Sequence, residues 1–170
     1  MGERIYVSSR GLELLRERVA RVEDDLKKIR QEKALAYTAS GDQWHDNPYF
    51  NKLEQDENAK VREIAELQRL IVSAQIFTPP GLRNTERVRL GSIVRFRRTY
   101  LETKEEQREV WEIVGYGELD VENKKVSYTS PLAQALMGME VGDTRQVQTP
   151  RGVAEYEILD LYENYEDASE

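Results

Sequence analysis

Apolar residues recur at alternating intervals of three and four along the first third of this chain. They are Leu12, Leu15, Val19, Val22, Leu26 and Ile29, and Lys33 and Ala36 follow in the same phase. This spacing forms one narrow stripe on an α-helix and is typical of a coiled coil. The positions between are mostly charged or amide residues, so a single partner stripe must cover the seam. The sequence therefore predicts a long helix that pairs through one side.

A second stripe of the same kind follows, interrupted by Glu57. Its members are Phe50, Leu53, Val61, Ile64, Leu67, Ile71 and Ala74. Antiparallel pairing about residue 43 brings the two stripes into one register, so we expect a helical hairpin over residues 1–78 rather than a coiled coil between separate chains. Lys33 and Glu57 make the seam polar near the turn, where we expect the pairing to be weakest.

The turn between the stripes, residues 38–49, reads TASGDQWHDNPY. It holds the one histidine of the chain, His45, together with Trp44 and the acidic residues Asp42 and Asp46. A large aromatic residue at an exposed turn either folds back on the hairpin or contacts a partner. Carboxylates at the end of a long arm indicate an end that reaches into another molecule.

Beyond the hairpin the periodicity changes to two. Paired prolines end the second helix and begin a linker over residues 79–82. Residues 93–98 and 110–114 are rich in β-branched and aromatic residues, as strands are. Ser130 and Pro131 begin a short helix. We expect a two-domain α+β protein, with a small antiparallel sheet and one helix over residues 83–163 and a disordered acidic tail over residues 164–170.

Composition excludes several classes of protein. The chain has no cysteine, so it has no disulfide framework and no thiolate nucleophile. Its formal net charge of −7 argues against binding bare nucleic acid through overall charge. A basic cluster at Arg95, Arg97 and Arg98 is better explained by an edge strand with outward charges than by a nucleic-acid site. No long uncharged apolar run occurs, so we expect a cytoplasmic protein without membrane contact.

Motifs along both domains resemble the GreA/GreB family of bacterial transcript cleavage and elongation factors. In the hairpin they are Gly41-Asp42, Tyr49 and Glu54-Gln55. In the second domain the series reads KVSYTSPLAQALMG from residue 125, then VGD, TPRG and YEIL. This series is specific, and the resemblance covers nearly the whole chain.

The resemblance implies a fold and a function. Family members have an antiparallel coiled coil and an FKBP-like domain, which docks at the rim of the secondary channel of RNA polymerase. The coiled coil enters the channel, and carboxylates at its tip help the polymerase active site to hold a second Mg²⁺ and an attacking water. Backtracked RNA is then cut near its 3′ end, so the factor is no enzyme by itself. We accordingly expect a monomeric partner of RNA polymerase and of the nascent RNA.

The tip departs from the family sequence, which reads roughly G-D-L-x-E-N-A-E-Y. We favour the alignment without gaps, which keeps Tyr49 and Glu54-Gln55 in register. It places Asp42 at the first acidic position, His45 at the second and Asp46 at the Asn position. A one-residue insertion would instead place Asp46 at the second acidic position. In one interpretation Asp42 and Asp46 face the Mg²⁺ while His45 orients water or contacts RNA. In another, the protein occupies the channel and regulates transcription without cleavage. In a third, His45 and Trp44 only shape the turn.

Two further expectations concern the second domain. The resemblance assigns polymerase docking to Ser127, Ser130 and Pro131, and Trp44 of the tip is a further candidate contact. A different function, prolyl isomerase or chaperone, would need a concave pocket lined by aromatic residues. Four residues could supply such a pocket only loosely: Tyr100, Trp111, Tyr128 and Tyr156.

Overall fold

The computed structural model describes residues 4–41 and 46–169. By its internal contacts the chain divides into two units. One consists of Met1–Ile5 and Leu12–Gln75, and the other of Tyr6–Gly11 and Ile76–Glu170. The first is a helical hairpin, and the second is a mostly antiparallel sheet with one short helix. The predicted two-domain α+β fold is therefore confirmed.

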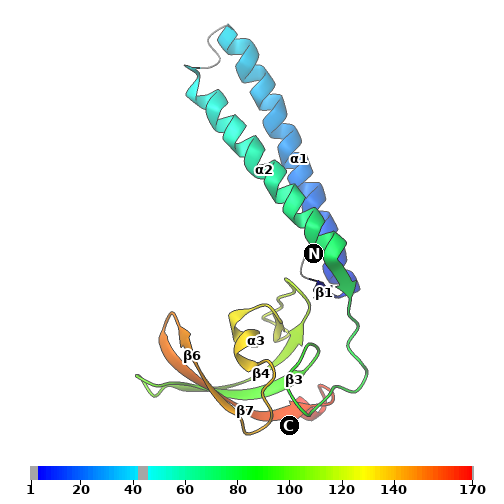
Figure 1. Cartoon of the computed structure of the whole chain (residues 1–170), viewed down its shortest axis with the longest axis vertical. Helices are drawn as coiled ribbons and strands as arrows, with labels where there is room; N and C mark the ends of the chain where they lie inside the picture. Colours follow the sequence, from blue (N-terminus) through cyan, green and yellow to red (C-terminus); the bar gives the residue numbers. More distant parts are fainter. Residues whose placement is uncertain (1–3, 42–45, 170) are drawn as a thin grey trace. The chain divides into compact units, whose positions relative to one another are not determined.

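Two long helices lie side by side in the hairpin (Figure 1): α1 (Ser9–Ser40) and α2 (Pro48–Ser73). The hydroxyl oxygen of Ser8 accepts a hydrogen bond from the backbone N–H of Gly11, as a helix N-cap does. Gly41 follows the last residue of α1 with φ +56°, a left-handed conformation that commonly ends a helix. No described helix is both long enough and apolar enough to cross a membrane.

The predicted seam supplies the contacts between α1 and α2. Its buried members include Val22, Leu26, Ala36, Phe50, Leu53 and Leu67. Toward the tip, Ala36, Phe50 and Leu53 form a small apolar cluster against which Ile29 packs. Ion pairs such as Lys60–Asp25 and Arg30–Glu57 join the helices across a centre near residue 43, as the predicted register requires.

The second helix ends earlier than its apolar stripe predicts. Ala74 has an extended backbone and begins strand β2 (Ala74–Ile76), which pairs with β1 (Ile5–Val7) in a two-stranded sheet. Strands of three residues are too short to show a period of two, so this pairing could not be predicted from periodicity.

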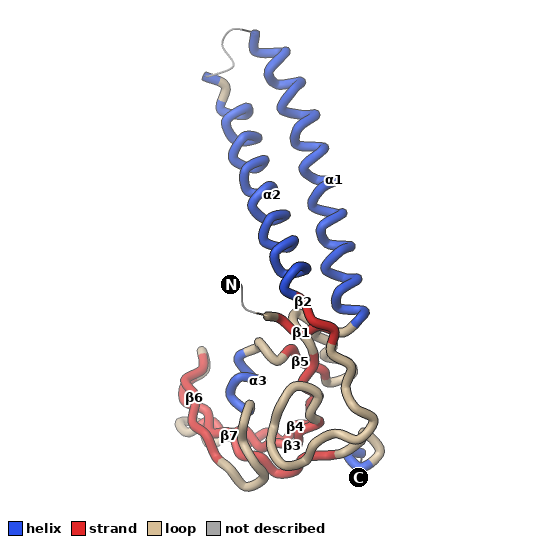
Figure 2. Tube along the Cα trace, turned by 45° about the vertical axis from the view of Figure 1, so that its right-hand side comes forward, coloured by secondary structure: helices blue, strands red, loops and turns tan. Residues whose placement is uncertain are grey.

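Five strands form the sheet of the second unit in the order β5-β4-β3-β7-β6 (Figure 2). They are β3 (Ile93–Tyr100), β4 (Glu106–Val114), β5 (Lys125–Ser127), β6 (Thr144–Thr149) and β7 (Gly152–Tyr162). The β4–β5 pair is parallel, unlike the all-antiparallel sheet that the sequence suggested, because the connection between them crosses back before β5 begins. The strand β3 is central, so the expectation of an edge strand at Arg95–Arg98 was wrong. Arg97 and Arg98 are instead paired with glutamates of the neighbouring strands.

The core of the second unit lies on one face of the sheet. The helix α3 (Pro131–Leu136) covers this face, and Leu136 packs with the fully buried Phe96, Ile113 and Ile158. The N-terminal segment Tyr6–Gly11 belongs to this unit. Val7 is fully buried and its carbonyl accepts a hydrogen bond from Phe77, while the carbonyl of Tyr6 accepts one from Tyr116.

The opposite face of β4 holds a buried carboxylate. Glu112, 3% exposed, lies 3.0 Å from the Arg83 guanidinium and 3.5 Å from the Lys125 ammonium group, and it accepts a hydrogen bond from Tyr165. Tyr165 lies in the acidic tail, whose described residues include a short helix η2 (Asp167–Ser169). The tail was expected to be disordered, and the tyrosine–carboxylate contact accounts for its order.

Candidate functional site

The hairpin tip is described at its two ends. Gly41 and Asp46 are exposed, whereas Asp42, Trp44 and His45 lie outside the described residues. Across residues 4–41 and 46–169, no group of three or more Asp, Glu or His side chains is arranged to hold a metal ion. The described part of the tip thus offers one exposed carboxylate, that of Asp46.

The residue after Asp46 caps the second helix. The side-chain oxygen of Asn47 accepts hydrogen bonds from the backbone N–H groups of Tyr49 (2.9 Å) and Phe50 (3.4 Å). Pro48 takes the first helical position, where a missing N–H costs nothing. The Nδ2 atom of Asn47 also lies 2.7 Å from the hydroxyl oxygen of Ser40, the last residue of α1.

Tyr49 makes a second link between the helices. Its hydroxyl donates to a carboxylate oxygen of Glu32 at 3.0 Å. This hydrogen bond stabilises the protonated phenol and so raises the pKa of Tyr49. Tyr49 therefore acts as a contact between the two helices.

An ion cluster lies below the tip. Glu57 is 2.8 Å from Arg30 and 3.0 Å from Lys33, which is also 3.4 Å from Glu54. The hydrogen bonds from Arg30 and Lys33 lower the pKa of Glu57, and the bond to Glu57 raises the pKa of Lys33. The polar seam residues Lys33 and Glu57 therefore form an ion pair with each other. The expectation of weak pairing near the turn did not include this favourable contact.

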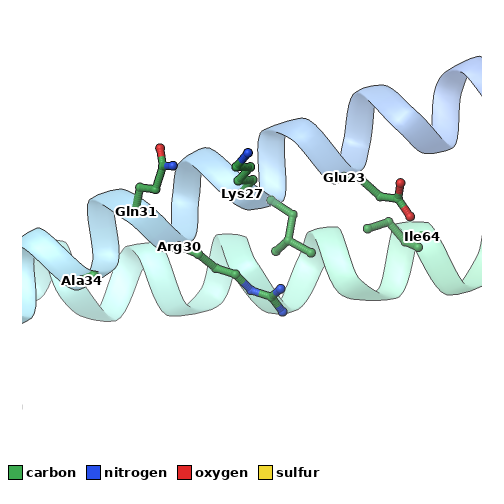
Figure 3. A pocket seen from close by; sticks show the side chains of 7 residues that line it. Glu23, Lys27, Arg30, Gln31, Ala34 and Ile64 are labelled. Carbon is green, nitrogen blue, oxygen red and sulfur yellow. The ribbon is translucent and has the colours of Figure 1, made fainter.

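A groove beside Arg30 is lined by residues of both helices (Figure 3). Its volume is about 510 Å³ and it is lined by Glu23, Leu26, Lys27, Arg30, Gln31, Ala34 and Ile64. A second hollow of about 400 Å³ lies nearer the tip, between Lys33, Tyr37 and Phe50. Both combine apolar walls with cationic side chains.

The predicted docking residues lie together at the corner between β5 and α3. Ser130 is the N-cap of α3 and accepts a hydrogen bond from Ala133, and Pro131 follows at the first helical position, where it is exposed. Ser127 is 7% exposed, and its hydroxyl bonds to Gly117 and Thr129. The exposed residues of this corner are therefore Thr129 and Pro131, whereas Ser130 is half-buried and Ser127 is buried.

The aromatic residues considered for an isomerase pocket are part of the core. Tyr100, Trp111 and Tyr156 are each less than 10% exposed. The Tyr100 ring is further covered by the guanidinium groups of Arg98, at 5.6 Å, and Arg151, at 4.6 Å. These three rings are therefore buried in the core and do not line an open pocket.

Comparisons with known proteins agree on one family. The family model described as "Transcription elongation factor, GreA/GreB, C-term" matches residues 83–163. Transcription elongation factor GreA of Beijerinckia indica is 31% identical over 146 residues, covering 82% of this chain and 90% of that protein. GreA of Chlorobium phaeobacteroides is 28% identical over 162 residues, covering 95% and 99%.

Among solved structures, the GreA factor homolog 1 (Gfh1) of Thermus thermophilus is similar at 23% identity and a TM-score of 0.43, covering 94% of this chain and 99% of that one. The sequence relatives are named as elongation factors rather than as enzymes, and they set the class of this protein, a transcription elongation factor. The chain belongs to the GreA/GreB family, which confirms the resemblance in its motifs.

Proposed function

We propose that this protein binds bacterial RNA polymerase by placing its hairpin in the secondary channel, and that it stimulates cleavage of backtracked RNA by the polymerase active site. The dimensions support this function. The shorter helix, α2, has 26 residues and spans roughly 40 Å. An arm of this length carries the tip residues far from the base of the hairpin.

The position of Asp46 is the observation that carries the proposal. It directly precedes Asn47, the N-cap of α2. In the family tip, Glu directly precedes Asn, and Asn is a far better N-cap than the Ala that follows it. Matching cap to cap supports an alignment of Asp46 with the family's second acidic position, within a loop that is one residue longer. This supports the alignment with an insertion over the ungapped one, which puts His45 there.

The donor chemistry fits a metal ion shared with the polymerase. Mg²⁺ prefers six oxygen ligands in octahedral geometry, and isolated carboxylates bind it weakly. Asp46 and, in our proposal, Asp42 each contribute a carboxylate, and the polymerase supplies the remaining ligands. When bound, a second Mg²⁺ stabilises the attacking and leaving oxygens of phosphoryl displacement. The contribution of this chain is to orient its carboxylates.

Docking in this proposal uses the corner between β5 and α3. Pro131 is exposed, and the cap at Ser130 fixes the start of the helix that presents it. The Ser127 hydroxyl forms hydrogen bonds with the hydroxyl and the backbone N–H of Thr129. We propose that a monomer acts in the cytoplasm, where it contacts RNA polymerase and the 3′ end of the nascent RNA.

A second candidate function rests on His45. Imidazole is a poor ligand for Mg²⁺, so a tip that presented His45 to the metal in place of a carboxylate would occupy the channel without supporting cleavage. The protein would then inhibit or modulate transcription.

One assay separates the two functions. RNA polymerase is stalled and backtracked on end-labelled RNA, and the protein is added with Mg²⁺. Cleavage predicts short 3′ fragments, lost in Asp42→Asn and in Asp46→Asn but retained in Asp56→Asn, which changes an exposed carboxylate on α2. Binding to polymerase without fragments from the native protein would reject cleavage and favour the regulator.

A further inference from the structure

One side chain joins the two helices where the tip loop begins and ends. Asn47 donates from Nδ2 to the Ser40 hydroxyl at 2.7 Å, and Ser40 in turn donates to the carbonyl of Ala36 at 2.8 Å. The donor and acceptor groups of the Asn47 side chain can make all of these hydrogen bonds at once. The Asn47 oxygen accepts from the first turn of α2, which leaves its amino group free to donate to Ser40. We name the contact between these two side chains the Ser40–Asn47 bridge.

The bridge lies immediately next to the loop residues. Gly41 follows Ser40, and Asp46 precedes Asn47. The bridge therefore sets the distance between the two points from which the loop leaves the hairpin. Both bridge residues are half-buried, so water competes less for this hydrogen bond than at a fully exposed site. Ala36, which accepts a hydrogen bond from Ser40, and Phe50, which donates one to Asn47, both belong to the apolar cluster with Leu53.

We propose that Ser40 and Asn47 are positioning residues, and that the bridge between them holds Asp46 in the orientation that cleavage requires. This inference rests on the proposed function. Functional side chains work best when the residues that carry them are themselves fixed by hydrogen bonds. A small displacement of such a group reduces the reaction rate more than it reduces binding.

Ser40→Ala tests the bridge without removing the cap. It deletes the hydroxyl, while Asn47 keeps its bonds to the first turn of α2. Ser40→Thr restores a hydroxyl at the same position. Thr38→Ala is the matched control, because the Thr38 hydroxyl makes the same type of bond, to the carbonyl of Ala34 at 3.0 Å, and no described bond to α2.

The first measurement is the cleavage rate of backtracked complexes as a function of factor concentration. For Ser40→Ala we expect the rate at saturation to fall about 3- to 10-fold, as the loss of one ordinary hydrogen bond would produce. The half-saturating concentration should not change, Thr38→Ala should match the native protein, and Ser40→Thr should recover the rate. An unchanged saturating rate, or a loss of equal size in Thr38→Ala, would overturn the inference.

The second measurement does not depend on cleavage. The chain has no cysteine, so Leu35→Cys and Lys52→Cys, both at exposed sites, give two unique spin-label positions near the tip. The distribution of distances between the labels should broaden in Ser40→Ala and stay narrow in Thr38→Ala. An unchanged distribution would refute the bridge.

The two measurements together separate the two proposals. If the polymerase releases no RNA fragments in the presence of the native protein, the proposed function is refuted. The distances between the labels then show only whether the bridge orders the tip. A broadened distribution with normal cleavage shows that the bridge orders the tip without positioning Asp46, which overturns the inference.

Discussion

The ammonium nitrogen of Lys33 lies 3.0 Å from a carboxylate oxygen of Glu57, at the point where the apolar seam of the hairpin is interrupted. Their side chains are 22% and 20% exposed, so the pair is more buried than a typical surface ion pair. A shift of the helices by one turn would separate these charges within a partly apolar seam. The pair therefore favours one register, as polar residues at single seam positions do in coiled coils.

Replacing Glu57 should destabilise the hairpin. Glu57→Gln removes the charge that Arg30 and Lys33 share, and we expect a loss of about 1 kcal/mol in the free energy of unfolding. Urea unfolding followed by far-UV circular dichroism measures it. Glu54→Gln is the control, because the Glu54 side chain is 53% exposed and its carboxylate lies farther from Lys33, at 3.4 Å. Equal effects of the two substitutions would contradict the special role of Glu57.

The same pair predicts a dependence on acid. Since the pKa of Glu57 is lower in the folded hairpin than in the unfolded chain, the folded state favours the ionised form. This stabilisation is present above the ordinary glutamate pKa of about 4.3 and is lost as pH falls through the lower folded value. Thermal unfolding of the native protein and of Glu57→Gln should therefore converge in acid, and a constant difference down to low pH would refute the linkage.

Removing the buried carboxylate of Glu112 should cost much more. In Glu112→Ala the Arg83 guanidinium, 15% exposed, loses its anionic partner, and we expect destabilisation of about 3 kcal/mol. Trp111 fluorescence in a Trp44→Phe background follows urea unfolding of the second unit. Glu140→Ala breaks the exposed Arg87–Glu140 pair and should change stability by less than about 0.5 kcal/mol. Similar losses in both variants would contradict the burial argument.

Gly115 should not tolerate a methyl group. A Cβ atom there would lie 2.9 Å from the Cα atom of Val7 and 2.3 Å from a Glu118 carboxylate oxygen. Backbone cannot move as a flexible side chain can, so Gly115→Ala should destabilise by about 1–3 kcal/mol. Gly81→Ala, with nothing within 4 Å of its added Cβ, is the control and should be neutral in the same unfolding measurement. A neutral Gly115→Ala would show that the segment holding Val7 is loosely packed.

Variants of Ser130 can separate helix capping from docking. Ser130→Ala removes the cap of α3 and should cost about 1 kcal/mol of stability, whereas Asn caps as well as Ser, so Ser130→Asn should be neutral. Polymerase affinity, measured by fluorescence anisotropy, then reports on docking. If the Ser130 side chain itself contacts polymerase, Ser130→Asn weakens binding without loss of stability. Unchanged affinity in Ser130→Asn would leave the cap as the role of this residue.

The hairpin could be predicted from sequence because a seam with a 3-4 spacing leaves few alternatives. The strands β1 and β2 and the ordered tail could not, since each depends on a contact between distant segments. Tyr165, for example, is fixed by Glu112, 53 residues earlier. No local period reports such a contact.

The hairpin tip likewise contains residues that could be predicted from the sequence and residues that could not. Motif resemblance singled out Asp42 and Asp46, but it missed Asn47 and Ser40. A signal for Asn47 was present, since Asn followed by Pro before an apolar run is typical of a helix start. The bond from Asn47 to Ser40 had no such signal, because it depends on the relative placement of two helices.

The incorporation of Tyr6–Gly11 into the second unit has a practical consequence for fragments of this protein. The family match begins at residue 83, yet a fragment cut there would lack Val7, which is fully buried, and the partners of Tyr116 and Glu118. During synthesis, the second unit cannot complete its packing around these first residues until almost the whole chain has been made. A domain boundary drawn where the family model begins would therefore divide a structure whose first strand comes from the other end of the chain.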